Sequence, residues 1–195
     1  MYDLRDRKGG EAMMEGYTRL SHTLKHQGAI VSCYTDEMQI PDGSVKKWDF
    51  IEHPGAAAML AQRADGKILM VRQCRPCIGQ VTLEIPAGGL NAGEDRKLCA
   101  MRELEEETGY RAKEAHHLFD LYTTVAFCNE KIGIYYATNL EKTSQHLDEG
   151  EYLNVEAHEL PELLSMVMDG RIQDSKTMAA LMAYEHMRQS GTIVF

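Results

Sequence analysis

The chain has 195 residues, of which 44% are hydrophobic and 26% are charged, a composition typical of a folded globular protein and not of a disordered or fibrous one. This length favours one domain with an accessory element over two full domains. The net charge of -9 opposes nonspecific binding to a nucleic acid or to an anionic membrane. An anionic substrate would therefore need a local cation, either a metal ion or a cluster of arginines.

The cysteines and the N-terminus indicate a cytoplasmic protein. Five scattered cysteines, an odd number, argue against a disulfide framework. Residues 1–15 are charged and lack the apolar stretch of a signal peptide, and no apolar run approaches the roughly 18 residues of a membrane span. Cys74 and Cys77 form one C-x-x-C pair without a second pair at zinc spacing, so we expect no zinc site there. We expect neither a membrane nor a nucleic-acid partner.

The N-terminal part of the chain predicts extended structure after a polar lead-in. Residues 1–27 are polar and weakly periodic, so they predict a flexible segment or a small helix. Residues 29–40 and 45–51 flank Pro41-Asp42-Gly43, a turn signal that predicts a β-hairpin. We expect residues 1–52 to form a separate N-terminal segment that contains this hairpin.

The remaining chain, residues 53–195, alternates extended segments with turns and ends in helices, which predicts an α+β domain. Residues 56–62 and 67–73 flank Asp65-Gly66 and predict a second hairpin. Further strands are predicted at residues 81–85, 117–123, 132–137 and 153–157.

Three helices are predicted in this domain. Apolar residues recur every three positions from Leu98 to Leu104, which indicates a helix over residues 98–108. Gly109 would end this helix as its C-cap. The two closing helices are predicted at residues 160–168 and 175–189.

The helix predicted over residues 98–108 carries a cluster of glutamates. At about 100° per residue, Glu103, Glu106 and Glu107 share one face, whereas Glu105 points elsewhere. Like charges at this spacing destabilise a helix by roughly 0.2–0.5 kcal/mol per pair, so they call for a counter-ion. Mg²⁺ or Mn²⁺ would supply it, because these ions prefer carboxylate oxygens and bridge to phosphates. The alternative is a solvated acidic face.

The segment from Gly88 to Tyr110 favours the metal site. It reads Gly88, five residues, Glu94, seven residues and then Arg102-Glu103-Leu104-Glu105-Glu106-Glu107-Thr108-Gly109-Tyr110. This segment resembles the Nudix box, G-x₅-E-x₇-R-E-U-x-E-E-x-G-U with U a bulky aliphatic or aromatic residue, without a mismatch. The order of hairpins, box helix, strands and terminal helix also resembles the Nudix fold, an α/β/α sandwich around a mixed sheet.

The resemblance to the Nudix family implies a metal-dependent hydrolase. It implies Mg²⁺-dependent hydrolysis of a nucleoside diphosphate linked to another group, with Mn²⁺ as a second candidate. Glu103 and Glu107 match the family's usual metal ligands, and Glu106 matches a further ligand or water contact. By the same resemblance Arg102 would orient the glutamates, and Glu94 would brace the loop before the helix.

Three flanking segments resemble the ADP-ribose pyrophosphatase branch of the family. Arg72 and Arg75 would hold pyrophosphate oxygens, which suit the planar guanidinium; surface salt bridges are the alternative. Glu84 would lie near the metal or the terminal ribose, or else pair with Arg72. In this branch the carbonyl oxygen of Ala87 would be a metal ligand. The segments are His53-Pro54-Gly55-Ala56, Val71-Arg72-Gln73-Cys74-Arg75 and Leu83-Glu84-Ile85-Pro86-Ala87-Gly88.

Residues 147–151 resemble the late acidic loop of the family, which delivers a catalytic glutamate. We expect Glu149 to be the general base and Glu151 an auxiliary metal ligand, because a mobile loop can bring a base to the attacking water. An acidic solvent loop is the alternative. The N-terminal hairpin, which in this branch often exchanges between subunits, implies a homodimer. Trp48 in that hairpin would stack on the base or pack at the dimer interface.

One departure from the branch concerns the substrate. The branch carries Ser-Pro-Gly after the strand that follows the box, where this chain reads Thr124-Val125-Ala126-Phe127. ADP-ribose, cleaved to AMP and ribose 5-phosphate, is the first expectation, and another nucleotide sugar such as GDP-mannose is the second. The rival is a Nudix-fold sensor that binds a metabolite without cutting it, and the intact box glutamates argue against that reading.

Overall fold

The computed structural model describes residues 15–192, which form two compact units. The first unit comprises the described residues up to His53 together with Ala126–Asn129, and the second comprises the rest. The expected lead-in lies, for residues 1–14, outside the described part of the chain. Among residues 15–192, no helix is long and apolar enough to cross a membrane.

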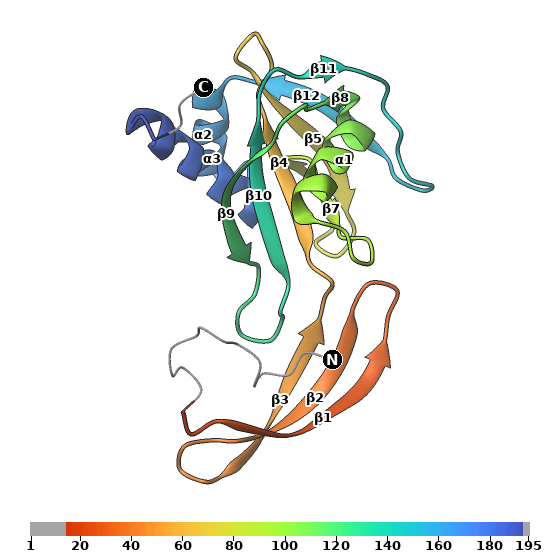
Figure 1. Cartoon of the computed structure of the whole chain (residues 1–195), viewed down its shortest axis with the longest axis vertical. Helices are drawn as coiled ribbons and strands as arrows, with labels where there is room; N and C mark the ends of the chain where they lie inside the picture. The colour runs from red at the N-terminus through yellow and green to blue at the C-terminus, as the bar shows by residue number, and fades with distance from the viewer. Residues whose placement is uncertain (1–14, 193–195) are drawn as a thin grey trace. The chain divides into compact units, whose positions relative to one another are not determined.

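The first unit is a three-stranded antiparallel sheet in the order β1-β2-β3 (Figure 1). The predicted hairpin is confirmed as β2 (Ser32–Gln39) and β3 (Val45–Glu52). The prediction of a flexible segment or small helix is wrong for β1 (Thr18–Gln27), which pairs with β2 along its length. Most of the β1 side chains are exposed, so the strand lacks the alternation that would have marked it in the sequence.

The second unit contains two larger sheets. A mixed sheet has the order β7-β4-β10-β9, in which β4 and β10 are parallel, and an antiparallel sheet has the order β12-β5-β6. Their strands are β4 (Ala56–Ala61), β5 (Ile68–Arg75), β6 (Gln80–Glu84), β7 (Ala87–Gly89), β9 (His116–Tyr122), β10 (Lys131–Ala137) and β12 (Leu153–His158). A small pair consists of β8 (Tyr110–Arg111) and β11 (Glu141–Lys142).

The second predicted hairpin is wrong in its pairing, although both of its strands exist. β4 and β5 follow one another across a tight turn, but they belong to different sheets. A single isolated bridge, Gln62 to Ile68, joins their ends. Every residue of β4 is buried, and both of its edges are taken by β7 and β10, so β5 pairs elsewhere.

Helices cover the strands of the second unit from two sides: α1 (Arg96–Thr108) lies on one side, and α2 (Leu160–Met168) and α3 (Ser175–Gln189) lie on the other (Figure 1). Alternate side chains of β4 point to opposite faces of its sheet, so the strand contributes to two cores. Leu60 packs in the core beneath α2 and α3, whereas Met59 packs with Leu104 of α1. This arrangement confirms the predicted α+β class and the α/β/α sandwich.

Leu181 and Met182 of α3 allow a matched test of the core beneath α2 and α3. Leu181 is fully buried, whereas Met182 is 53% exposed. We expect Leu181→Ala to lower the free energy of unfolding by about 2–5 kcal/mol, because it removes buried methyl groups and leaves a cavity. Met182→Ala should change it by less than about 0.5 kcal/mol. Urea unfolding followed by circular dichroism measures both, and equal losses would contradict the assigned core.

Candidate active site

The box helix α1 is fixed at both ends by polar contacts. It begins two residues earlier than predicted, because the Asp95 side chain caps it by accepting the N–H groups of Lys97 (2.9 Å) and Leu98 (3.3 Å). It ends at Gly109, whose φ of 67° is the left-handed conformation that favours glycine. The sequence therefore determines both ends of the helix that carries the carboxylates.

A loop that follows β11 caps the C-terminal carbonyls of α1. The N–H of His146 donates to the Glu106 carbonyl (2.9 Å), and Gln145 Nε2 donates to the Glu107 carbonyl (2.7 Å). A Cβ atom at Gly109 would lie 2.9 Å from the Gln145 nitrogen, so only glycine permits this approach. The acidic loop 147–151 therefore starts at the end of the box helix.

Arg102 ties the box together. Its guanidinium donates to both oxygens of Glu94 (2.8 and 2.9 Å), and Nη1 donates to Glu103 (2.7 Å) and Glu106 (2.8 Å). Nη2 also donates to the Gly89 carbonyl (3.2 Å). The hydrogen bond from Arg102 is the main reason why the pKa of Glu94 falls to about 2. Arg102 thus fixes the loop before α1 and two carboxylates on the helix at once.

Gly88 makes room for one of these carboxylates. A Cβ atom built on Gly88 would lie 2.0 Å from Oε1 of Glu103, far inside any contact distance. The side chain of Glu103 therefore occupies the space that any other residue at position 88 would need. The first glycine of the box is required by this packing.

Glu107 is the most buried carboxylate of the cluster, with 2% of its surface exposed. One of its oxygens accepts the N–H of Ala87 (3.0 Å). Burial is the main cause that raises its pKa to about 8, and the charges of Glu103 and Glu151 raise it further. Burial likewise raises the pKa of Glu103, with Glu106 and Glu151 adding to the effect. These glutamates repel one another, so a bound cation would stabilise their ionised forms.

The carboxylates fit a divalent cation by their chemistry, although the side chains are not gathered into a finished metal site. Within residues 15–192, no three His, Cys, Asp or Glu side chains converge closely enough to hold a metal ion. Glu103 and Glu106 contact Arg102 instead, and Glu105 points away to Arg111 (2.7 and 2.8 Å) as predicted. Hard oxygen donors that repel one another suit a divalent cation.

Cys99 is part of the site, although no motif in the sequence marks it. Its buried thiol lies 3.6 Å from the Gly88 carbonyl and 3.5 Å from the Gly89 carbonyl. Burial is the main cause that raises its pKa to about 12, so the thiol stays protonated and acts as a donor to the loop. In the sequence, only its position on the buried face of the predicted helix indicated that Cys99 lies near the box loop.

The two glutamates of the acidic loop occupy different positions. Glu151 is close enough to Glu103 and Glu107 for its charge to raise their pKa values. Its N–H donates to the Asp148 carbonyl (3.0 Å) in a turn, whereas Glu149 in that turn is exposed. The structure thus brings Glu151 to the box carboxylates and leaves Glu149 at the solvent-facing tip.

The structure does not bring Arg72 and Arg75 together. Residues three apart on a strand face opposite sides of the sheet. Arg72 forms a bidentate ion pair with Glu156 of β12, while Arg75 forms one with Glu84 of β6 (2.7 and 2.8 Å). Glu84 therefore pairs with Arg75 and not with Arg72, which was the alternative considered from the sequence.

Lys176 completes the ion-pair network around Glu84 and was missed in the sequence. Glu84 is 2% exposed and binds Lys176, which is 7% exposed and also contacts Asp174 (3.0 Å). Burial would raise the pKa of Glu84, but the hydrogen bond from Arg75 and the charge of Lys176 lower it to about 2. A lysine in the first turn of α3 is unfavourable with the positive end of the helix dipole. Its presence there was the signal in the sequence that Lys176 has an acidic partner.

Trp48 lies in the first unit and is 46% exposed. Its ring centroid is 6.1 Å from that of Tyr17, with the planes tilted by 39°. About half of the Trp48 side chain is therefore accessible to solvent.

Comparison with known proteins decides the family. The NUDIX domain model matches residues 52–181. The chain belongs to the Nudix hydrolase family. Hydrolases of this family generally use a divalent metal ion, in agreement with the hard oxygen donors of the box.

Individual relatives of this Nudix hydrolase agree with that assignment. The chain is 36% identical over 156 residues to the ADP-ribose pyrophosphatase of Bacillus subtilis (strain 168), covering 79% of this chain and 84% of the relative. It is 38% identical, with the same coverage, to a methanol dehydrogenase activator of Bacillus methanolicus. A crystal structure of an ADP compounds hydrolase superposes with a TM-score of 0.78 at 20% identity, over 91% of this chain and 97% of that one, which shows a common fold.

Gly88 and Gly89 provide a matched test of the carboxylate packing. Gly88→Ala should displace the Glu103 carboxylate and lower hydrolytic turnover by about 10²-fold, the usual cost of a misplaced catalytic group. Gly89→Ala should leave turnover close to wild type, because a Cβ there meets nothing within 4 Å. Turnover and thermal unfolding are measured for both. Equal turnover in the two variants would contradict the role of the space at Gly88.

Glu84 predicts a dependence of stability on pH. Its pKa is lowered from 4.5 to about 2 in the folded chain, so its contribution is complete above pH 4.5 and is lost as the pH falls towards 2. Glu84→Gln should lower the free energy of unfolding by about 3 kcal/mol at neutral pH, since it leaves Lys176 buried without its partner. The difference from wild type should shrink across that acidic window. Urea unfolding at several pH values measures it, and a constant difference would contradict the assignment.

Proposed function

We propose that this Nudix hydrolase cleaves the pyrophosphate bond of a nucleoside diphosphate sugar, with ADP-ribose as the first substrate and AMP and ribose 5-phosphate as products. The observation that carries the proposal is the cluster of Glu103, Glu107 and Glu151, in which burial and mutual repulsion raise the pKa values of Glu103 and Glu107. Such a cluster can hold the cation that a pyrophosphate needs in an acidic protein. The similarity to an ADP-ribose pyrophosphatase supports the choice of sugar nucleotide.

We propose Mg²⁺ as the cofactor, with Mn²⁺ as a substitute. When bound, the ion would offset the charge of the pyrophosphate and lower the pKa of a bound water. Arg102 keeps Glu103 and Glu106 oriented towards the site by one shared nitrogen, Nη1. The proposed metal donors are the carboxylates of Glu103, Glu106 and Glu107, the carbonyl of Ala87 and, as an auxiliary ligand, Glu151.

The proposed substrate contacts come from Arg75, Glu84 and Trp48. Arg75 remains partly exposed although it is paired, and the charge of nearby Glu107 acts on it, so it is placed to receive a phosphate oxygen. Glu84 holds the Arg75 fork in position from the buried side. Trp48 offers a half-exposed ring for stacking on the base. Arg72 is bound to Glu156 on the other face of β5, and we assign it to the stability of the sheet.

We propose Glu149 as the general base. It would take a proton from the attacking water while the water adds in line to one phosphorus and the other phosphate leaves. The loop that carries it is fixed to the end of α1 by His146 but exposes Glu149 at its turn. A loop that is attached at His146 and exposed at Glu149 can bring a base to the water after the substrate has bound.

We propose a cytoplasmic homodimer that forms through the N-terminal hairpin. Within the strands of the first unit, the buried side chains are those of Asp36 and Met38, so this sheet has almost no core of its own. Three-stranded sheets need a packed hydrophobic face to be stable. Leu20, Leu24 and Trp48 are about half exposed and would be covered by a second copy. The five cysteines are free, which agrees with a reducing compartment.

A panel of nucleotides tests the proposed reaction. ADP-ribose, GDP-mannose, UDP-glucose, NADH and diadenosine polyphosphates are incubated with Mg²⁺ or with EDTA, and the products are separated by chromatography. Metal-dependent release of AMP from ADP-ribose is the expected result. GDP-mannose is the second candidate, because Thr124-Val125-Ala126 stands where the branch carries Ser-Pro-Gly. If no member of the panel is cleaved while one of them still binds in the presence of Mg²⁺, the proposal is contradicted and a sensor is favoured.

Replacing Glu149 tests the base. Glu149→Gln should lower kcat by about 10²–10⁴-fold, the usual contribution of a positioned base, while KM changes little. Glu114→Gln is the control, since Glu114 is also an exposed glutamate but lies away from the acidic loop. Steady-state kinetics on the substrate found above provide the measurement. An unaltered kcat in Glu149→Gln would remove this residue from the mechanism.

A further inference from the structure

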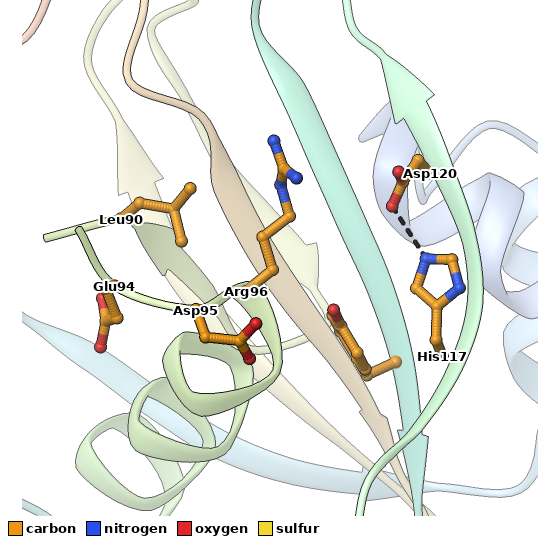
Figure 2. Close-up of a pocket in the computed structure, with 7 residues that line it drawn as sticks. Leu90, Glu94, Asp95, Arg96, His117 and Asp120 are labelled. Carbon is orange, nitrogen blue, oxygen red and sulfur yellow. Dashed lines mark hydrogen bonds and ion pairs between the residues drawn. The ribbon is translucent and has the colours of Figure 1, made fainter. Parts of the chain in front are cut away.

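A cavity of about 460 Å³ lies beside the first turn of α1, between that helix and strands β9 and β10 (Figure 2). Pockets for small molecules measure roughly 300–1,000 Å³, so this one has room for a compact ligand. It is lined by Arg96 and Asp95 of the helix start, His117 and Asp120 of β9, and Tyr135 of β10. None of these residues has a role in the reaction proposed above.

Arg96 is a cation without a partner in this cavity. Its Nε atom is buried, and no described residue supplies a hydrogen-bond acceptor for it. Its guanidinium forms no ion pair within residues 15–192. In Figure 2 the side chain extends between Leu90 on one side and Asp120 on the other. A buried donor without an acceptor costs about 1–3 kcal/mol, so the arrangement favours a ligand that supplies one.

Two glycines hold Arg96 against the sheet. A Cβ atom on Gly133 would lie 3.1 Å from Cδ of Arg96, and one on Gly55 would lie 3.8 Å from Nη2. Gly133 stands inside the buried strand β10, where a glycine weakens the strand and marks a close approach of another group. Here that group is the stem of Arg96. The arginine is therefore held in place by the sheet and not by an acid.

The acids around the cavity already have partners. Glu94 binds Arg102, and Asp95 accepts two N–H groups of α1. Asp120 binds Lys131 and also contacts Nε2 of His117 at 2.8 Å, as Figure 2 shows for the histidine. Nε of Arg96 is therefore a buried donor of this lining that has no acceptor among the described residues.

Tyr135 adds a second donor. It is 8% exposed, and it belongs to the lining of the cavity. Burial raises the pKa of Tyr135, the charges of Asp95 and Asp120 raise it further, and the charge of Arg96 lowers it. A guanidinium and a phenolic hydroxyl that line the same cavity form a donor pair that suits the oxygens of an anion.

We propose that this cavity binds the phosphate group of a small phosphate monoester through Arg96 and Tyr135. The choice of a phosphate monoester rests on the proposed function, whose products are compounds of this class. Free inorganic phosphate shares the same chemistry, so the test must separate the two sources. The cavity volume leaves room for a sugar beside the phosphate, and His117 and Asp120 offer acceptors for its hydroxyl groups.

Nuclear magnetic resonance of arginine Nε–H groups tests the site directly. The full chain, labelled with ¹⁵N-arginine and kept in Mg²⁺, is titrated with ribose 5-phosphate and separately with inorganic phosphate. The signal missing in Arg96→Gln identifies Arg96. We expect this signal to shift on titration, with ribose 5-phosphate binding more tightly than inorganic phosphate. An unmoved signal overturns the proposal, and equal affinity for the two ligands overturns recognition of a monoester.

Two variants and one control complete the test. Calorimetric titration with ribose 5-phosphate should show binding at least about tenfold weaker in Arg96→Gln and several-fold weaker in Tyr135→Phe, as expected for lost charge-assisted and neutral hydrogen bonds. Lys97→Gln removes the same charge from the adjacent, exposed position and should bind normally. An equal loss in Lys97→Gln would overturn the assignment. Ribose 5-phosphate contains no pyrophosphate, so this outcome is independent of whether ADP-ribose is hydrolysed.

Discussion

The structure of the site depends on the contacts of one guanidinium. Arg102 is a single positive charge among crowded glutamates, and its planar fork reaches Glu94, Glu103 and Glu106 together. This compensation is partial. It suffices to hold the box loop and the helix face in one geometry, but it does not reach Glu107, whose pKa stays raised by burial and by Glu103 and Glu151. The box is thus rigid enough to orient carboxylates and still negative enough to attract a metal ion.

Backbone geometry provides the rest of the site. Gly88 and Gly109 stand where a Cβ atom would collide with Glu103 and with the Gln145 backbone, so the glycines of the box permit close packing at both ends of α1. The helix itself is held by the strands of the mixed sheet, through Leu104 packed with Met59. The glutamate side chains supply the charge of the site. The missing side chains at Gly88 and Gly109 allow the glutamates and the neighbouring loop to pack close together.

Features encoded by neighbouring residues could be predicted from the sequence. The box helix, its Gly109 cap and the β2–β3 hairpin follow from local periodicity and turn chemistry. Pairing between distant strands cannot be predicted from neighbouring residues, so the turn between β4 and β5 wrongly predicts that these two strands pair. The same limit applies to side chains: that Arg75 would meet Glu84 and Lys176 depends on which strand and which helix lie next to β5.

The attachment of the acidic loop at both ends sets how far its tip can travel. His146 is bonded to the Glu106 carbonyl, and Leu153 begins β12, which is paired with β5. The intervening residues 147–152 can span at most about 22 Å when fully extended, at roughly 3.3–3.6 Å per residue. A tether this short confines its tip to a small volume beside the box. Motions of such short loops occur in nanoseconds to microseconds, so repeated attempts at the productive position fit within one turnover.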